Sequence, residues 1–246
     1  MEKKLAGKKV IVAGGSRGIG KQLVLELAAQ GAHVLFTYVS NEAESRATEE
    51  EARRVNPYVI GMKANIGSKE DMIKVFDYIP AHFGGKPDIY IGVAFPKSIF
   101  APTAYMTEEG FDSMFTAVKG HYFTLQKAAQ SLNNGGKIIV FSSGAAAMPQ
   151  MASGAYSGAK AAIEKFALAL SKETGTQQIT VNIVSPGVTE TDGLVAPKEM
   201  IDMLVAQTPL GRLGTVSDVA KATLQLCMPE MSWVNGQVIQ VNGGIL

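Results

Sequence analysis

Short apolar segments rich in Val and Ile alternate along the chain with longer segments in which apolar residues recur every three or four positions. The short segments are continuous apolar runs bounded by Gly or Pro, a pattern typical of strands buried on both faces. They predict strands over Lys9–Ala13, His33–Tyr38, Tyr58–Lys63, Asp88–Val93, Lys137–Ser142, Thr180–Ser185 and Gln237–Val241. The longer segments predict helices over Gly18–Gln30, Asn41–Arg54, Lys69–Ile79, Glu108–Ser131, Ala155–Glu173 and Ser217–Cys227.

This alternation predicts the fold class. Strands that alternate with helices form parallel sheets with right-handed crossovers. No repeat, low-complexity tract or linker divides the chain, so we expect an α/β fold: one doubly wound, Rossmann-type domain over residues 1–246 with a mostly parallel seven-stranded sheet. Residues 188–214 contain no predicted strand and carry two prolines around a short helix candidate, Lys198–Ala206. We expect this segment to form a mobile lid over the site.

Composition narrows the classes of protein that fit this pattern. The chain has 246 residues, a hydrophobic fraction of 46% and a formal net charge of +1. That charge favours binding neither to nucleic acid nor to an acidic membrane surface. No apolar run approaches the ~18 residues of a membrane span, and no apolar signal region opens the chain, so we expect a cytoplasmic protein.

Cysteine and histidine usage argues against a disulfide or a metal site. Cys227 is the single cysteine and lies in an apolar helical segment, which predicts a buried core position and fits a reducing compartment. His33, His82 and His121 are widely separated, and no pair has the spacing of metal ligands. We therefore expect no metal, and we expect each histidine to lie on the surface or to be satisfied locally.

The first predicted strand ends in a glycine-rich turn, Gly14-Gly15-Ser16-Arg17-Gly18-Ile19-Gly20, inside which the next helix begins. Glycines at these positions allow a sharp turn and a close approach of the backbone to a pyrophosphate. The N-terminus of the helix adds free N–H groups and a partial positive charge. A tight strand–helix turn without any ligand is also often glycine-rich. The place of this turn, in the first βα unit of an α/β pattern, favours a dinucleotide site.

The end of the second predicted strand indicates which dinucleotide binds. An acidic residue there would bind the ribose 2′-hydroxyl of NAD. The chain instead has Tyr38-Val39-Ser40-Asn41, with no acid before Glu42, and Arg17 lies in the neighbouring turn. An arginine with small polar groups suits a 2′-phosphate, so we predict NADP(H) as the cofactor. The alternative is that Arg17 is a solvated loop residue and that Ser40 and Asn41 only cap a helix.

Ser143, Tyr156 and Lys160 form the candidate catalytic set. Tyr156 and Lys160 are four residues apart and share a helix face, while Ser143 follows the fifth predicted strand. We expect the Lys160 ammonium and a nicotinamide ring to lower the phenol pKa from about 10. Tyr156 would then exchange a proton with a carbonyl oxygen that Ser143 orients. A Tyr and Lys pair at this spacing is by itself more often a surface pair, and its value comes from the glycine turn and from Ser143.

These residues together resemble the short-chain dehydrogenase/reductase family over nearly the whole chain, with a general likeness to the 3-oxoacyl-carrier-protein reductase type. The resemblance implies that Lys160 also holds the nicotinamide ribose. It implies that Thr189, through its backbone, and Thr191, through its hydroxyl, bind the carboxamide after Pro186-Gly187. It also implies a homotetramer or homodimer. Pattern and resemblance together predict that the cofactor contacts Gly14, Ser16, Arg17, Gly18, Ile19, Gly20, Tyr38, Ser40, Asn41, Asn65, Ile66, Tyr156, Lys160, Pro186, Gly187, Thr189 and Thr191.

The chain departs from the family pattern around the catalytic set. The family's Asn-Asn-Ala-Gly, whose first side chain braces the sheet, reads Gly92-Val93-Ala94-Phe95 here. The family's fourth catalytic residue, an asparagine at a helix bulge that holds a water beside the lysine, should lie near Val118. The segment Phe111–Phe123 contains none and is one residue short, which we expect to straighten the helix. Thr116 and Lys119 are the candidates to compensate.

Two further positions bear on the substrate. Asn134 and Gln177 stand where carrier-protein reductases carry arginines, which argues against a carrier-protein substrate and favours a small ketone, a CoA ester or a cyclic ketone. An apolar substrate pocket is predicted from five residues that are otherwise simply core: Phe95, Met148, Met151, Val188 and Met203.

The pattern leaves three functions open. The first is an NADP(H)-dependent ketone reductase, which the glycine turn and the catalytic set favour. The second is an NADP(H)-binding sensor or scaffold with weak or lost catalysis, which the missing asparagine favours. The third is an enoyl reductase, suggested by Ala94-Phe95-Pro96. Enoyl reductases of this fold place their Tyr and Lys further apart, which speaks against the third function.

Overall fold

Seven parallel strands form the central sheet of the computed structural model, which describes residues 3–191, 193–194 and 197–245. Their order is β3-β2-β1-β4-β5-β6-β9, and every pairing is parallel. This is the doubly wound arrangement that the alternation predicted. The strands are β1 Lys9–Ala13, β2 His33–Tyr38, β3 Val59–Lys63, β4 Ile89–Gly92, β5 Lys137–Phe141, β6 Thr180–Pro186 and β9 Val238–Val241.

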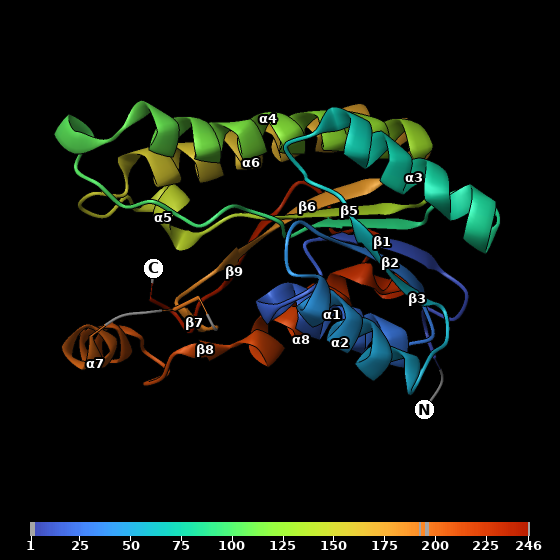
Figure 1. Cartoon of the computed structure of the whole chain (residues 1–246), viewed down its shortest axis with the longest axis horizontal. Helices are drawn as coiled ribbons and strands as arrows, with labels where there is room; N and C mark the ends of the chain where they lie inside the picture. The colour runs from blue at the N-terminus through green and yellow to red at the C-terminus, as the bar shows by residue number, and fades with distance from the viewer. Residues whose placement is uncertain (1–2, 192, 195–196, 246) are drawn as a thin grey trace.

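Helices cover both faces of the sheet (Figure 1). Helices α3, α4 and α6 lie on one face, and α1, α2 and α8 lie on the other. The helices are α1 Gly18–Ala29, α2 Glu42–Arg53, α3 Lys69–Phe83, α4 Glu108–Ser131, α5 Gly144–Ala147, α6 Gly154–Glu173, α7 Lys198–Gln207 and α8 Val216–Cys227. Three short 3₁₀ helices, Thr103–Tyr105, Gly175–Gln177 and Pro229–Met231, complete the described elements.

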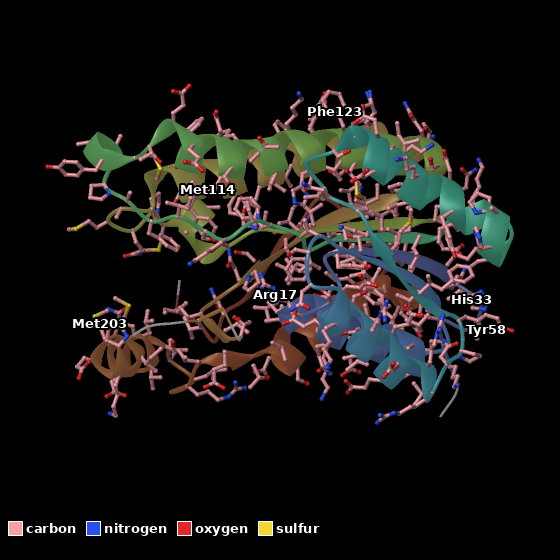
Figure 2. The ribbon with its side chains drawn as sticks, viewed as in Figure 1. Arg17, His33, Tyr58, Met114, Phe123 and Met203 are labelled. Atoms are coloured by element: carbon pink, nitrogen blue, oxygen red, sulfur yellow. The ribbon has the colours of Figure 1, made fainter. Side chains whose placement is uncertain are left out.

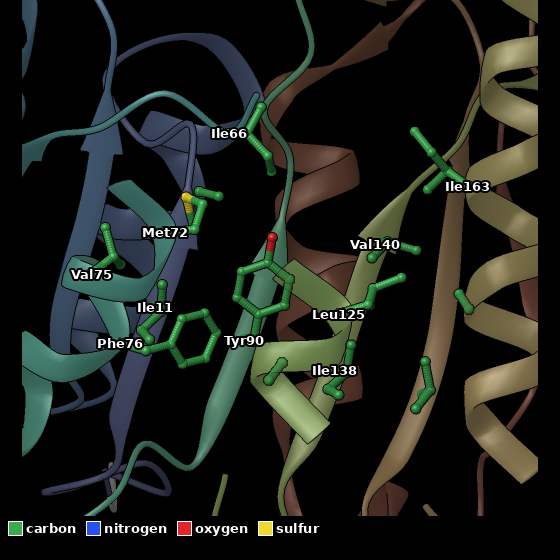
Figure 3. Close-up of a cluster of buried hydrophobic side chains, with 14 of the residues drawn as sticks. Ile11, Ile66, Met72, Val75, Phe76, Tyr90, Leu125, Ile138, Val140 and Ile163 are labelled. Atoms are coloured by element: carbon green, nitrogen blue, oxygen red, sulfur yellow. The ribbon is translucent and has the colours of Figure 1, made fainter. Parts of the chain in front are cut away.

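Burial on both faces explains why the strands are continuous apolar runs. In β1, Ile11 packs into the cluster under α3 and α4, while Val10 and Val12 pack into the cluster under α1 and α8. Figure 3 shows part of the first cluster, with Phe76 and Tyr90 packed beside Ile11. Cys227 is buried in α8, and burial raises the pKa of its thiol to about 12, so the core position predicted for it is confirmed.

One helix end differs from the prediction. We predicted that the helix starting at Lys69 ends at Ile79, but α3 continues through Pro80 to Phe83. Proline fixes its own φ near the helical value, so a helix can carry it through a final turn at the loss of one hydrogen bond. Stacking of Tyr78 on His82, with ring centroids 3.5 Å apart, packs that last turn.

The predicted lid region is described only in part. Its ends pair as two short parallel strands, β7 Thr189–Glu190 and β8 Gly214–Thr215, and α7 lies between them at one end of the molecule (Figure 1). None of the described residues of α7 is buried. Residues 192 and 195–196, which fall inside the predicted lid, lie outside the described residues. The lid therefore stays a prediction.

No helix among the described residues combines the length and apolar character needed to cross a membrane. Within the same residues, no group of three or more His, Cys, Asp or Glu side chains is arranged to hold a metal ion.

Candidate active site

A cleft of about 890 Å³ opens at the carboxyl ends of β1, β2 and β4. The strand order reverses between β1 and β4, because β1 pairs with β2 on one side and with β4 on the other. In open α/β sheets this switch point is where ligands bind. The segments around the ends of β1 to β4 supply most of the cleft wall, and α4, α6 and the segment after β7 supply further residues.

The glycine turn is closed tightly against the sheet. A Cβ at Gly14 would lie 2.8 Å from the Cα of Ala94, and a Cβ at Gly20 would lie 1.8 Å from the Gly14 carbonyl oxygen. The Gly14 amide donates to Thr37 Oγ1 at 3.1 Å, and Thr48 Oγ1 donates to the Ser16 carbonyl at 3.1 Å. The turn therefore presents bare backbone to the cleft at the start of α1, which fits a pyrophosphate.

The ribose end of the cleft carries an acid that sequence reasoning missed. Tyr38, Ser40 and Arg17 line this end, and Arg17 lies at the start of α1 (Figure 2). Asn41 caps α2, because its side chain accepts from the Glu44 amide at 3.2 Å. Glu44 lines the same wall, and among the described residues its buried Oε2 has no hydrogen-bond partner. Glu44 lies beyond the end of β2, and only the first helical turn of α2 brings it to the cleft wall.

The three residues predicted to form the catalytic set lie close together. Ser143 follows β5 by two residues and caps α5, while Tyr156 and Lys160 project from α6. The side chains of Ser143 and Ser98 lie close enough to the Tyr156 hydroxyl to lower its pKa as hydrogen-bond partners. The ring of Phe95 lies edge-on to Tyr156, with centroids 5.9 Å apart, and Lys160 Nζ lies 4.1 Å from the centroid of that same ring.

The electrostatics of the set differ from our expectation. We expected the Lys160 ammonium to lower the pKa of Tyr156. Instead, burial raises the pKa of Tyr156, and the hydrogen bonds with Ser143 and Ser98 only oppose that rise. Burial also lowers the pKa of Lys160 to about 7, and Lys160 Nζ donates to the Phe141 carbonyl at 3.2 Å. Desolvation disfavours the charged form of both groups, so the chain by itself holds Tyr156 as a neutral phenol.

Helix α4 runs without a break from Glu108 to Ser131, which agrees with the straightening predicted from the shortened segment. Val118 is buried in the core, Thr116 lines the cleft and Lys119 is exposed. His121 of α4 reaches the segment after β4, where its Nε2 lies 2.8 Å from the Ala94 carbonyl oxygen. It is 1% exposed, and Lys160 is close enough to help lower its pKa.

Most of the predicted cofactor contacts share one cleft. Those that line it are Gly14, Ser16, Arg17, Gly18, Ile19, Gly20, Tyr38, Ser40, Asn41, Asn65, Ile66, Tyr156, Lys160 and Thr191. Pro186, Gly187 and Thr189 are not among the lining residues: Pro186 ends β6, Gly187 follows it, and Thr189 begins β7, where its Oγ1 donates to the Gly187 carbonyl at 3.0 Å.

The predicted substrate residues are more scattered. Phe95 lines the cleft, whereas Met148 and Met151, which follow Ser143 in the chain, are exposed to solvent. Met203 is exposed on α7, far from Arg17 (Figure 2), and Val188 precedes β7. The pocket built from these residues stays a prediction.

Comparisons with known proteins agree with this fold and cleft. A family model described as enoyl-(acyl carrier protein) reductase matches residues 13–246. The hydroxynaphthalene reductase-like protein Arp2 of Metarhizium anisopliae is 35% identical over 256 residues, covering 98% of this chain and 95% of the relative. A short-chain dehydrogenase of Burkholderia cenocepacia, solved in complex with NADP, has a TM-score of 0.92 at 28% identity, covering 98% of this chain and 99% of its own. The angucycline C-6 ketoreductase LanV, solved with bound NADP, has a TM-score of 0.92 at 28% identity, covering 100% of this chain and 98% of its own.

Fold, cleft and similarities together define an oxidoreductase of the doubly wound α/β class. Within that class the chain belongs to the short-chain dehydrogenase/reductase family, as the resemblance predicted. The description of the matching family model does not decide the reaction, because the relative and the neighbours above bear the names of other reductases and dehydrogenases.

Proposed function

We propose that this protein is an NADP(H)-dependent ketone reductase that uses Ser143, Tyr156 and Lys160. The observation that carries the proposal is the partly buried, neutral Tyr156 phenol, which lines the glycine-lined cleft with Ser143 and Ser98 close enough to influence its pKa. Carbonyl reduction needs a proton donor at the carbonyl oxygen, and a phenol with a raised pKa keeps its proton at neutral pH. Bound NADPH would supply the hydride.

Other residues of the chain bind the cofactor, orient the substrate and support the proton transfer. The turn at Gly14–Gly20 and the N-terminus of α1 bind the pyrophosphate. Ser143 orients the carbonyl oxygen toward the Tyr156 hydroxyl, which gives up its proton as the carbon–oxygen double bond becomes a single bond. Lys160 holds the nicotinamide ribose and, when charged, favours the phenolate that this step leaves behind.

Arg17 supports NADP(H) over NAD(H), because its guanidinium suits a 2′-phosphate and it stands at the ribose end of the cleft. The two structural neighbours solved with NADP agree with that choice. Glu44 on the same wall acts against it, because a carboxylate repels a phosphate. We therefore assign the preference for NADP(H) to Arg17 and a weakening of that preference to Glu44.

The surroundings of Tyr156 favour a flat cyclic ketone as the substrate. The ring centroids of Phe95 and Phe100 lie 5.9 Å and 5.3 Å from the centroid of the Tyr156 ring, so aromatic rings flank Tyr156. The loops before β5 and β6, which carry Asn134 and Gln177, meet where the Gly135 amide donates to the Gln177 carbonyl at 2.9 Å. Neither position offers the cation that an acidic carrier protein needs. The names hydroxynaphthalene reductase-like protein and angucycline C-6 ketoreductase agree with a carbonyl on a ring.

The test is NADPH and NADH oxidation across a panel of cyclic ketones, bicyclic aromatic ketones, diketones, keto esters and enones, with product analysis. We expect NADPH to be consumed fastest with the ring ketones and the product to be the alcohol. Reduction of the C=C bond of the enones alone would instead make the protein an enoyl reductase. Tight NADPH binding without turnover of any panel member would favour the sensor or scaffold function.

A further inference from the structure

The segment that follows β4 carries two side chains that touch the catalytic set. Phe95 packs against both Tyr156 and Lys160, and Ser98 lies close enough to the Tyr156 hydroxyl to lower its pKa as a hydrogen-bond partner. The position of this segment, residues 93–98, therefore determines how Tyr156 and Lys160 are held.

On one side, the segment is fixed to the end of β1. The amides of Val93 and Ala94 donate to the Ala13 carbonyl at 3.0 Å and 2.8 Å. Gly14 packs so closely that a Cβ there would lie 2.8 Å from the Cα of Ala94. These contacts hold the amide side of Ala94 against the glycine turn.

On the other side, the segment is fixed by a histidine of α4. His121 Nε2 lies 2.8 Å from the Ala94 carbonyl oxygen, and because a carbonyl only accepts, Nε2 carries the hydrogen. His121 Nδ1 is buried and has no partner among the described residues. Burial and the nearby Lys160 lower the pKa of His121 to about 4, so the ring is neutral at physiological pH and Nδ1 is an acceptor.

Gly92 leaves room for this arrangement. A Cβ at Gly92 would lie 2.9 Å from Tyr90 Oη and 3.3 Å from His121 Cε1. Figure 3 shows the Tyr90 hydroxyl pointing toward the carboxyl end of β4. Two side chains, Tyr90 from the same strand and His121 from α4, thus occupy the space where a side chain at position 92 would begin.

We propose that His121 is a positioning residue for the reaction: its Nε2–H holds the Ala94 carbonyl, and through residues 93–98 it holds Phe95 and Ser98 against Lys160 and Tyr156. His121 touches neither a bound ligand nor the reacting atoms in this role. The inference deepens the proposed function, because it assigns the support of the same catalytic set to a residue of α4.

The test compares His121→Leu, which removes the donor, with His121→Gln, whose amide N–H reaches in the same direction. Thr124→Val is the matched control, because Thr124 is equally buried on α4 and its hydroxyl donates only to the Gly120 carbonyl of its own helix. For His121→Leu we expect kcat to fall about 10- to 100-fold, as for a small misplacement of catalytic groups. NADPH affinity should stay within a few-fold. His121→Gln should recover most of kcat, and Thr124→Val should keep it.

A purely structural role would not move the pH dependence. Loss of the Ser98 hydrogen bond raises the pKa of Tyr156, so the alkaline limb of the kcat profile for reduction should shift to higher pH in His121→Leu and stay in place in His121→Gln. Hydrogen–deuterium exchange of residues 94–98 reports on the His121–Ala94 hydrogen bond without any turnover. We expect faster exchange in His121→Leu and unchanged exchange in His121→Gln. If His121→Leu does not fold, His121→Asn, whose donor is too short to reach Ala94, replaces it.

Unchanged kcat, pH profile and exchange in His121→Leu would overturn the inference, and so would a His121→Gln variant that behaves like His121→Leu. Absence of carbonyl turnover in the unmodified protein would overturn the proposed function alone, because the exchange comparison still reports on His121.

Discussion

The two ends of the cleft are built by different means. At the phosphate end, the backbone forms the site: Gly14 and Gly20 let the turn close on itself, and the start of α1 faces the cleft. At the catalytic end, side chains from distant segments form the site. Phe95 and Ser98 lie around Tyr156, and His121 reaches from α4 to the Ala94 carbonyl. A backbone site is encoded locally and can be recognised in a short motif. A site formed by side chains depends on packing between helices and strands. The residues that form it can therefore differ between proteins while their spatial arrangement is kept.

If the phosphate end is encoded by bare backbone, adding one methyl group there should have a large effect. In Gly20→Ala the new Cβ would meet the Gly14 carbonyl oxygen at 1.8 Å, so the turn must open. We expect NADPH affinity to fall about 10- to 100-fold, which corresponds to the 1–3 kcal/mol typical of overpacking. Isothermal titration with NADPH measures the change. Gly175→Ala, where a Cβ meets nothing within 4 Å, is the control and should bind like the unmodified protein. Equal affinity of the two variants would contradict the role of the turn.

Lys160, which is buried at the catalytic end, should make the free energy of unfolding depend on pH. Burial lowers the pKa of Lys160 to about 7, whereas in the unfolded chain it lies near 10.4. Between these values the unfolded state binds more protons, so Lys160 makes the free energy of unfolding rise with pH. Urea unfolding at pH 7 and pH 9 should show a rise that is smaller by about 1–2 kcal/mol in Lys160→Met. An identical rise in both proteins would mean that Lys160 is not desolvated as described.

Substitution of Glu44 should change the ratio of NADPH to NADH affinity. Its buried Oε2 has no partner among the described residues and lies on the wall that Arg17 shares. Removing this charge in Glu44→Gln should increase the ratio of NADPH to NADH affinity by about 5- to 10-fold, equivalent to roughly 1 kcal/mol of repulsion at a partly solvated site. Glu50→Gln, an exposed glutamate of the same helix, is the control. A shift toward NADH in Glu44→Gln would show that Glu44 binds the ribose instead.

The smallest effect is expected at Tyr90. Its hydroxyl is buried and lacks a partner among the described residues, and burial raises its pKa. An unsatisfied buried hydroxyl is costly, so Tyr90→Phe should leave the free energy of unfolding unchanged or raise it by about 1 kcal/mol. Thermal unfolding followed by circular dichroism measures this. A loss of 2 kcal/mol or more would mean that the hydroxyl has a partner, and it would change the description of the space beside Gly92.

The same contrast explains how far the sequence predicts this molecule. Strand and helix positions follow from apolar periodicity, and the phosphate turn and the Tyr156–Lys160 pair follow from local spacing, so these were predicted to within a few residues. His121 was expected to be an ordinary surface or locally satisfied histidine, because nothing near it in the chain indicates that it reaches Ala94. Glu44 was missed for the same reason, since only the geometry of α2 brings it to the cleft. The pKa of Tyr156 is raised by burial, and the spacing of residues in the sequence does not predict how far a side chain is buried.

The central claim is that Tyr156 donates the proton in an NADPH-dependent carbonyl reduction, and Tyr156→Phe tests it most directly. The measurement is single-turnover NADPH oxidation with the best ring ketone of the panel, alongside NADPH affinity for the same two proteins. We predict that the variant binds NADPH within a few-fold of the unmodified protein and that its rate falls about 10²- to 10⁴-fold, the contribution of a general acid. A variant that binds NADPH and reduces the ketone at the unmodified rate would contradict the account.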